Sequence, residues 1–396
     1  MVARGDLRHS ERRESSMNPR MTRRTLVKRG AAGAALLSLP SFLAACGGGG
    51  GGGAEVSGPL RFANWQLYID IDEATKKSPT LEAFTAETGI SVEYFEEINA
   101  NDEYFGKIQG PLSAGQSIDR DIIVLTDVTR YPKLLIDNGW LEEIDRDLIP
   151  NFDNLVQVQK SPPFDPDRKW SIPWQSGITG IAYNAKLAPE PITSMAQLLE
   201  DPRLKGKVTV VDGFEDTGAL VMLANGDDPS NVTDEAYQKA IDRIQKAVDS
   251  GQIRQFTGND YTGPLAKGDL IAAVAWSGDI VQLAADNPDL KWGVPDDGGM
   301  IWTDTMFVPK GGNVAAASKF MNFVLDPAIA AQLAAYINYI TPVAGARDEA
   351  AKLDAELAQN PLIFPNEETL GKVHQYDANA ASNDVYLEKW AALKGA

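Results

Sequence analysis

Short apolar runs alternate with segments of helical periodicity along most of this chain, and this alternation limits the folds that it can adopt. The runs that predict strands are Leu60–Trp65, Ile90–Tyr94, Asp121–Leu125, Lys207–Val211 and Ile271–Trp276. The segments that predict helices are Thr80–Thr88, Asp234–Ser250, Ala315–Leu325 and Pro327–Tyr336. Strands that alternate with helices pack as α/β layers, and about 340 residues are enough for two domains.

The N-terminus has a basic, then an apolar, then a small-residue segment. Five Arg or Lys side chains between Arg20 and Arg29 precede the uncharged run 30–45, a pattern typical of a secretion signal and too short for a comfortable membrane span. Arg23–Lys28 resembles a twin-arginine export motif, and Leu43–Cys46 resembles a lipobox, in which the signal is cut before an acylated cysteine. We therefore predict a signal region over 1–46 with lipidation at Cys46, followed by a flexible glycine-rich linker over 47–57.

The charge balance separates this leader from the rest of the chain. Residues 1–45 hold nine basic and three acidic side chains, so the remainder carries a net charge of −24. Such an acidic body should repel nucleic acid and attract cations. Cys46 is the only cysteine, so no disulfide is possible and stability must come from the core.

Aromatic and acidic side chains recur where predicted strands end, or as Trp and Asp pairs nearby. They are Trp65, Tyr68, Asp127, Asp212, Glu215, Asp216, Trp276, Asp279, Trp302 and Asp304, with Thr126 directly before Asp127. Ligands of open α/β sheets bind beyond the carboxyl ends of the strands. A lone Trp is usually a core residue and a lone acid usually caps a turn or helix. It is therefore the joint recurrence that indicates a binding site.

Ring faces and carboxylates together suit an elongated organic cation. An aromatic face attracts an ammonium group by about 2 kcal/mol when both are desolvated. A carboxylate about 4 Å from an ammonium gains on the order of 4 kcal/mol at intermediate dielectric, whereas an exposed pair gains only about 0–1 kcal/mol. The cleft must therefore close around such a ligand, and the empty, acid-lined protein is expected to rest open.

Several segments resemble the polyamine-binding proteins of bacterial ABC importers, the spermidine/putrescine group. They are Asn64–Tyr68, Trp170–Trp174, Trp276–Asp279, Gly298–Asp304 and Asn338–Pro342. The resemblance implies a type II periplasmic-binding-protein-like α/β fold of two lobes, each a mixed sheet flanked by helices, with the ligand cleft between them. Residues 58–177 plus 303–346 would form one lobe and 178–302 plus 347–396 the other, with crossings near Gly177, Trp302 and Ala346.

The resemblance also assigns roles to individual residues. The side chains that it implies as flanking the ligand or packing on its methylene groups are Trp65, Tyr68, Trp276, Trp302 and Tyr339. Asp279 and Asp304 would accept its ammonium groups, and the positions of Asp216 and Gln375 contact the ligand in some members.

The chain departs from the family pattern after its third strand. Thr126 and Val128 stand where members often have Ser and Tyr, so we expect Thr126 to bind and Asp127 to supply charge in place of the missing tyrosine. Where family members have two adjacent acids, this chain has Asp212 and Gly213, so the choice between putrescine and spermidine stays open.

The expected partners are a polyamine, the permease subunits of an ABC importer and, through acylated Cys46, the membrane of the cell from which the chain is exported. We expect a monomer. A binding protein for a sugar, an amino acid or a metal is the alternative, and a secreted hydrolase or lyase is a more distant one. His374 is the only histidine after the leader, and no Gly-x-Ser-x-Gly or His-Glu-x-x-His motif occurs, so no catalytic residue, metal ligand or cofactor is predicted. Paired carboxylates, as in glycosidases, stay open as an enzyme site.

Overall fold

The computed structural model describes residues 58–395, so the predicted signal region, Cys46 and the linker 47–57 lie outside the described residues. The strands are β1 (Leu60–Trp65), β2 (Val92–Ile98), β3 (Ile122–Thr126), β4 (Ser171–Asn184), β5 (Val208–Val211), β6 (Ile253–Thr257), β7 (Ala272–Trp276), β8 (Leu290–Gly293), β9 (Gly299–Phe307) and β10 (Val373–His374). The helices are α2 (Pro79–Thr88), α3 (Asn101–Ser113), α4 (Tyr131–Asp137), α5 (Met195–Glu200), α6 (Ala219–Ala224), α7 (Asp234–Asp249), α8 (Thr262–Lys267), α9 (Ser277–Asp286), α10 (Val314–Val324), α11 (Pro327–Ile337), α12 (Ala346–Leu353), α13 (Glu367–Leu370) and α14 (Asp384–Lys394).

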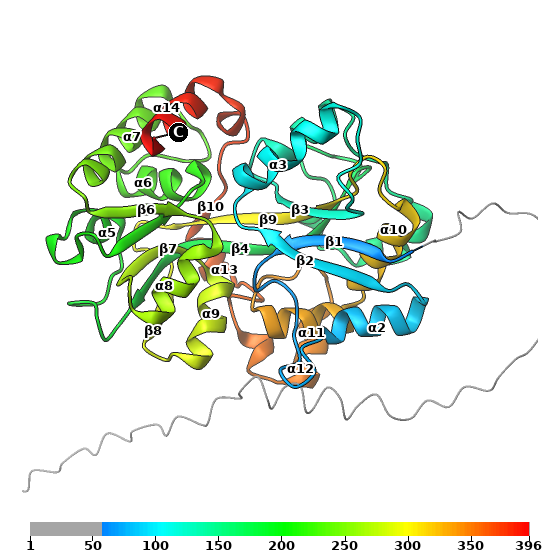
Figure 1. Cartoon of the computed structure of the whole chain (residues 1–396). Helices are drawn as coiled ribbons and strands as arrows, with labels where there is room; N and C mark the ends of the chain where they lie inside the picture. Colours follow the sequence, from blue (N-terminus) through cyan, green and yellow to red (C-terminus); the bar gives the residue numbers. More distant parts are fainter. Residues whose placement is uncertain (1–57, 396) are drawn as a thin grey trace, which may run out of the picture. The chain divides into compact units, whose positions relative to one another are not determined.

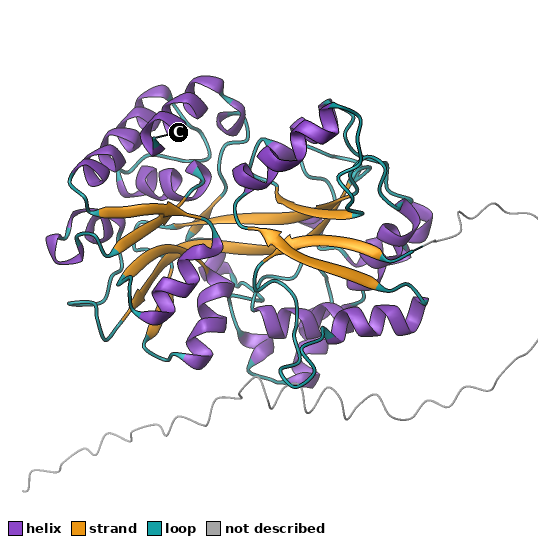
Figure 2. Cartoon of the chain, viewed as in Figure 1, coloured by secondary structure: helices purple, strands orange, loops and turns teal. Residues whose placement is uncertain are grey.

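Two sets of parallel strands are joined through a pair of long antiparallel strands. The hydrogen-bonded order is β2-β1-β3-β9-β4-β7-β5-β6, with β10 beside β9 and β8 beside β4 (Figure 1). β1 is parallel to β2 and β3, β5 is parallel to β6 and β7, and β4 and β9 pair antiparallel in the middle. Helices lie on both sides of the strands (Figure 2). The mixed α/β class that the sequence predicts is confirmed.

The buried apolar side chains form two clusters. One gathers around β1, β3, α2, α10 and α11, and the other around β5, β7, α6, α7 and α14. Gly177 of β4 faces Trp302 of β9 in the antiparallel ladder that joins the two parallel sets. The residue boundaries that we predicted for two lobes stay a prediction.

Local sequence signals account for most of the predicted elements. α7 begins after Thr233, whose hydroxyl accepts the backbone N–H of Ala236, and its buried face includes Tyr237, Ile241 and Ile244. Every strand and helix predicted from the sequence has a counterpart whose ends differ by a few residues. The sequence did not predict β4, β6, β8, β9 or β10.

Candidate functional site

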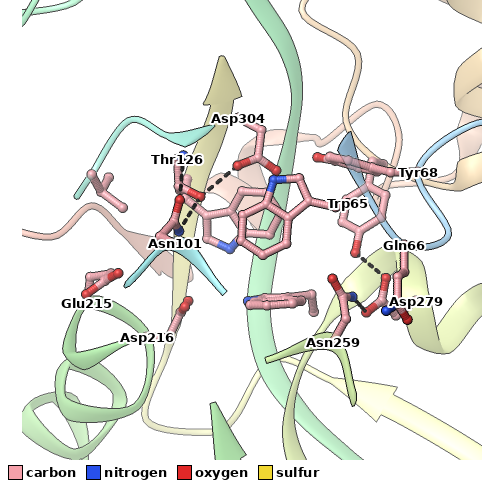
Figure 3. Close-up of a pocket in the computed structure, with 14 residues that line it drawn as sticks. Trp65, Gln66, Tyr68, Asn101, Thr126, Glu215, Asp216, Asn259, Asp279 and Asp304 are labelled. Atoms are coloured by element: carbon pink, nitrogen blue, oxygen red, sulfur yellow. Dashed lines mark hydrogen bonds between the residues drawn. The ribbon is translucent and has the colours of Figure 1, made fainter. Parts of the chain in front are cut away.

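A cavity of about 400 Å³ lies between the two hydrophobic clusters, and we call it the central cavity (Figure 3). Nine of the eleven predicted binding residues line it, namely Trp65, Tyr68, Thr126, Asp216, Trp276, Asp279, Trp302, Asp304 and Tyr339. Five further residues complete the lining, namely Gln66, Asn101, Val128, Glu215 and Asn259. The structure thus brings together residues that are up to 274 positions apart in sequence.

Three residues of this lining lie at the ends of strands. Trp65 ends β1, Thr126 ends β3 and Trp276 ends β7, so all three lie at carboxyl ends of strands, as the sequence predicted. Trp302 and Asp304 instead lie inside β9, two residues apart, where strand geometry points them to the same face. The sequence predicted this Trp and Asp pair as part of the site but did not predict the strand that carries it.

The aromatic rings form a continuous wall. The ring of Trp276 lies 5.7 Å from that of Trp65 and 6.2 Å from that of Trp302, measured between centroids. Tyr339 continues the wall at 5.9 Å from Trp302 and 4.7 Å from Tyr68. Most of these contacts are edge-to-face, the arrangement that the ring quadrupole favours.

Two glycines make room for this wall. A Cβ atom added at Gly278 would lie 2.2 Å from the Tyr339 ring, and one added at Gly177 would lie 2.5 Å from the Trp302 ring. A side chain at either position would have to displace the ring, because real Cβ atoms essentially never come this close to another atom.

The Asp279 carboxylate is held by three neutral donors. Tyr339 donates its hydroxyl to Oδ1 at 2.7 Å, while Tyr261 and Asn259 donate to Oδ2 at 2.7 and 2.8 Å. The side chain is 1% exposed. Burial raises the pKa of Asp279 to about 6, although these hydrogen bonds oppose the shift.

Asp304, inside β9, is another carboxylate of the lining. Thr126 donates its hydroxyl to Oδ1 at 2.7 Å, and Asn101 in turn donates to that hydroxyl at 2.8 Å. Tyr68 points its hydroxyl toward the same carboxylate (Figure 3). Burial raises the pKa of Asp304 to about 7, and the charges of Asp127 and Asp216 add to the rise.

A second acidic group occupies the turn after β5. Phe214–Gly218 form a π-helical turn that carries Glu215 and Asp216. Thr179 donates its hydroxyl to Asp216, and the Trp302 indole N–H donates to Thr179 at 2.9 Å. Burial raises the pKa of Asp216 to about 6, and burial together with the Asp216 charge raises the pKa of Glu215 to about 8.

The four carboxylates have no basic side chain among the described lining residues of the cavity. Burying an ionised carboxylate without a counter-charge is strongly unfavourable, and this explains why all four pKa values are raised. The arrangement therefore favours a ligand that brings positive charge to these carboxylates and apolar surface to the aromatic wall.

Two predicted residues lie outside this lining. Asp127 follows β3, but its carboxylate accepts the backbone N–H of Thr303 at 2.9 Å and so holds β9 rather than facing the cavity. Gln375 follows β10 and is exposed. Cys46 lies outside the described residues.

The sequence offered unequal signals for the residues that it missed. Glu215 was already among the acids that the sequence places after a predicted strand, although no ligand contact was assigned to it, and Val128 directly adjoins the predicted Asp127. Asn259 follows β6, a strand that the sequence did not predict, and Asn101 begins α3, for which no helix was predicted. Gln66 lies between Trp65 and Tyr68, next to Leu67, whose φ of 58° places the chain in the left-handed region.

Within residues 58–395, no cluster of three or more His, Cys, Asp or Glu side chains could hold a metal ion. No single helix of this range is long and apolar enough to span a membrane. Only α10 and α11 taken together reach that length, and they meet at a bend of 80°.

Residues 80–365 match the family described as bacterial extracellular solute-binding protein. The chain belongs to this family. It is similar to the spermidine/putrescine-binding periplasmic protein of Escherichia coli, with 27% identity over 345 residues that cover 86% of this chain and 93% of the relative. A putrescine-binding periplasmic protein of the same organism is 27% identical over 357 residues, which cover 85% of this chain and 91% of that one.

A solved structure from Listeria monocytogenes, described as a spermidine/putrescine ABC transporter, has a TM-score of 0.71 and 27% identity and covers 85% of this chain and 98% of its own. The predicted type II periplasmic-binding-protein fold and the resemblance to polyamine-binding proteins are confirmed. Family members bind solutes for transport rather than transform them.

Proposed function

We propose that this solute-binding protein captures a polyamine, such as putrescine or spermidine, in the central cavity. The observation that carries the proposal is the placement of four carboxylates, those of Glu215, Asp216, Asp279 and Asp304, around one aromatic wall. A linear polyamine has ammonium groups for the acids and methylene groups for the rings. The similarity to spermidine/putrescine-binding and putrescine-binding periplasmic proteins supports the same choice.

Closure of two lobes belongs to the same proposal. Residues 58–177 with 303–346 form one lobe, and 178–302 with 347–396 form the other. Carboxylates from both lobes repel one another in a closed, ligand-free cleft, so a dication that supplies the missing charge binds the closed form better and shifts the population toward it. An importer then recognises the closed form as loaded.

Export and anchoring complete the proposal. The leader 1–46 directs the chain out of the cytoplasm, acylated Cys46 anchors it to the membrane, and the linker 47–57 lets the body reach the permease of an ABC importer. Cys46→Ser should release the protein from the membrane fraction or leave the leader uncut. Identical fractionation of wild type and variant, both with the leader intact, would refute the anchor.

Binding is tested by thermal unfolding with putrescine, spermidine and maltose. A ligand that binds only the folded form raises the free energy of unfolding by about 2.7 kcal/mol at a hundredfold excess over Kd. We expect the polyamines, and not maltose, to raise the melting temperature. An increase with maltose alone would favour a sugar-binding protein, and no shift with millimolar polyamine would exclude the proposal.

A further inference from the structure

A smaller hollow of about 300 Å³, which we call the side hollow, adjoins the central cavity. The two share Trp65, Asn101, Glu215, Asp216 and Trp276 as lining residues. The side hollow adds two more acids, Asp102 from α3 and Asp212 from the end of β5. The acidic lining therefore continues from Glu215 and Asp216 to Asp102 and Asp212, and Trp65 and Trp276 line both spaces.

Lys394 pairs with both of these acids, although it is not one of the residues that line the side hollow. Its Nζ lies 2.5 Å from Oδ1 of Asp212 and 3.6 Å from Oδ2 of Asp102. Asp102 belongs to an α-helix beside the first hydrophobic cluster, whereas Asp212 and Lys394 belong to elements of the second. The Lys394 side chain is 13% exposed, so its ammonium group is largely removed from water.

The end of α14 holds the lysine in place. Trp390, one turn earlier, donates its indole N–H to the backbone carbonyl of Asp212 at 2.7 Å. The Lys394 Nζ lies 5.7 Å from the centroid of the Trp390 ring. Because Trp390 packs in the second hydrophobic cluster, the ammonium group is tied to the rigid part of the molecule.

We propose that Lys394 is a specificity-determining residue. Its ammonium group lies beside Asp212 and Asp102, and it disfavours a ligand with three ammonium groups relative to a ligand with two. This inference rests on the proposed polyamine binding. A diamine that spans the central cavity ends near Glu215 and Asp216 and does not reach Lys394. The additional ammonium group of a triamine lies near the Lys394 ammonium group, which repels it. Asp212 cannot compensate, because it is already paired with Lys394.

The test measures Kd for putrescine and for spermidine by calorimetry on the wild type and on Lys394→Met. Methionine keeps much of the side-chain length and removes the charge, which frees Asp102 and Asp212 for the third ammonium group. We expect the ratio of the putrescine Kd to the spermidine Kd to rise by about tenfold or more. An unchanged or lower ratio overturns the inference.

Two matched variants separate a local effect from a change in net charge. Lys389→Met removes the same charge from the same helix at a position that makes no ion pair with Asp102 or Asp212, and it should leave the ratio unchanged. Equal shifts in the two variants would overturn the inference. Asp212→Asn leaves Lys394 less neutralised, so it should lower the ratio, and it tests the same point if Lys394→Met does not fold.

The outcomes also separate this inference from the proposed function. If the wild type binds neither putrescine nor spermidine, the polyamine function itself fails. If the wild type binds them and Lys394→Met leaves their ratio unchanged, only the specificity role of Lys394 fails.

Discussion

The Tyr339 hydroxyl donates a 2.7 Å hydrogen bond to Oδ1 of Asp279, joining the segment after α11 to the first turn of α9. This bond is one of three that stabilise the ionised form of a carboxylate buried in the cavity wall. It links the aromatic wall to the acidic group, because the same tyrosine ring packs against Trp302.

Tyr339→Phe should move the pH range in which the protein binds. Loss of one donor removes an interaction that lowers the pKa of Asp279, so that pKa should rise above about 6. Putrescine affinity, measured by calorimetry, should therefore fall more at pH 6 than at pH 8. Tyr183→Phe, outside the cavity lining, is the control, and an equal loss of affinity at both pH values would contradict this role.

Asp304→Asn should weaken polyamine binding by more than about tenfold, or roughly 1.4 kcal/mol, because a desolvated ion pair is lost. The amide oxygen can still accept the Thr126 hydroxyl, and above pH 7 the variant no longer buries a charge. The free protein should therefore be no less stable than the wild type at pH 8 in thermal unfolding.

Asp297→Asn is the matched control, since Asp297 is exposed just before β9. This substitution should change neither the polyamine affinity nor the stability in thermal unfolding. A less stable Asp304→Asn protein with unchanged affinity would show that Asp304 serves the fold and not the ligand.

Without a ligand, the conformation described here should lose stability as the pH rises from about 4 to about 8. The pKa values of Asp216 and Asp279 (about 6), Asp304 (about 7) and Glu215 (about 8) lie above those of the unfolded chain. The folded state therefore binds more protons in this window, so stability is highest below the unfolded pKa values and falls as pH rises through the folded ones. Denaturant unfolding at pH 5 and pH 8 checks the sign, and higher stability at pH 8 would contradict it.

Polyamine affinity should follow the opposite trend. Ammonium groups stay charged across this range, whereas the carboxylates ionise as the pH rises, so binding should strengthen between pH 5 and pH 8. Near pH 6–7 binding should also release protons, which calorimetry in two buffers of different ionisation enthalpy detects. No proton release would show that the carboxylates are already ionised in the free protein.

Gly278→Ala should destabilise the fold and weaken binding together. Its Cβ would lie 2.2 Å from the Tyr339 ring, and overpacking of this kind costs about 1–3 kcal/mol. Gly263→Ala is the matched control because nothing lies within 4 Å of its Cβ and its position in α8 is helical. The control should leave stability unchanged or raise it by about 0.4–1 kcal/mol. Equal effects on both variants would show that the contact with Tyr339 is unimportant.

Local patterns in the sequence were sufficient to predict the helices that bury one face and the strands that are short apolar runs. β1 begins and ends where predicted, and α7 differs by one residue, because its apolar spacing and its Thr233 cap are local signals. β4 escaped prediction because it is buried along nearly its whole length and so lacks alternation, and it contains Pro173, Gly177 and Gly180. β9 was recognised from its sequence only as a pairing of Trp302 with Asp304, and no strand was predicted for it.

The sequence alone predicted which residue types would bind a cation, and nine of the eleven predicted residues line one cavity. Only the tertiary structure decided how the carboxylates are held and how far their pKa values rise. Aspartate is most often a surface residue. The Asp279 carboxylate is nevertheless buried and accepts hydrogen bonds from Asn259, Tyr261 and Tyr339, which come from three different segments. Burial and contacts between distant residues arise only when distant segments pack together. The same packing holds the Asp127 carboxylate against β9 and places Lys394 beside Asp212.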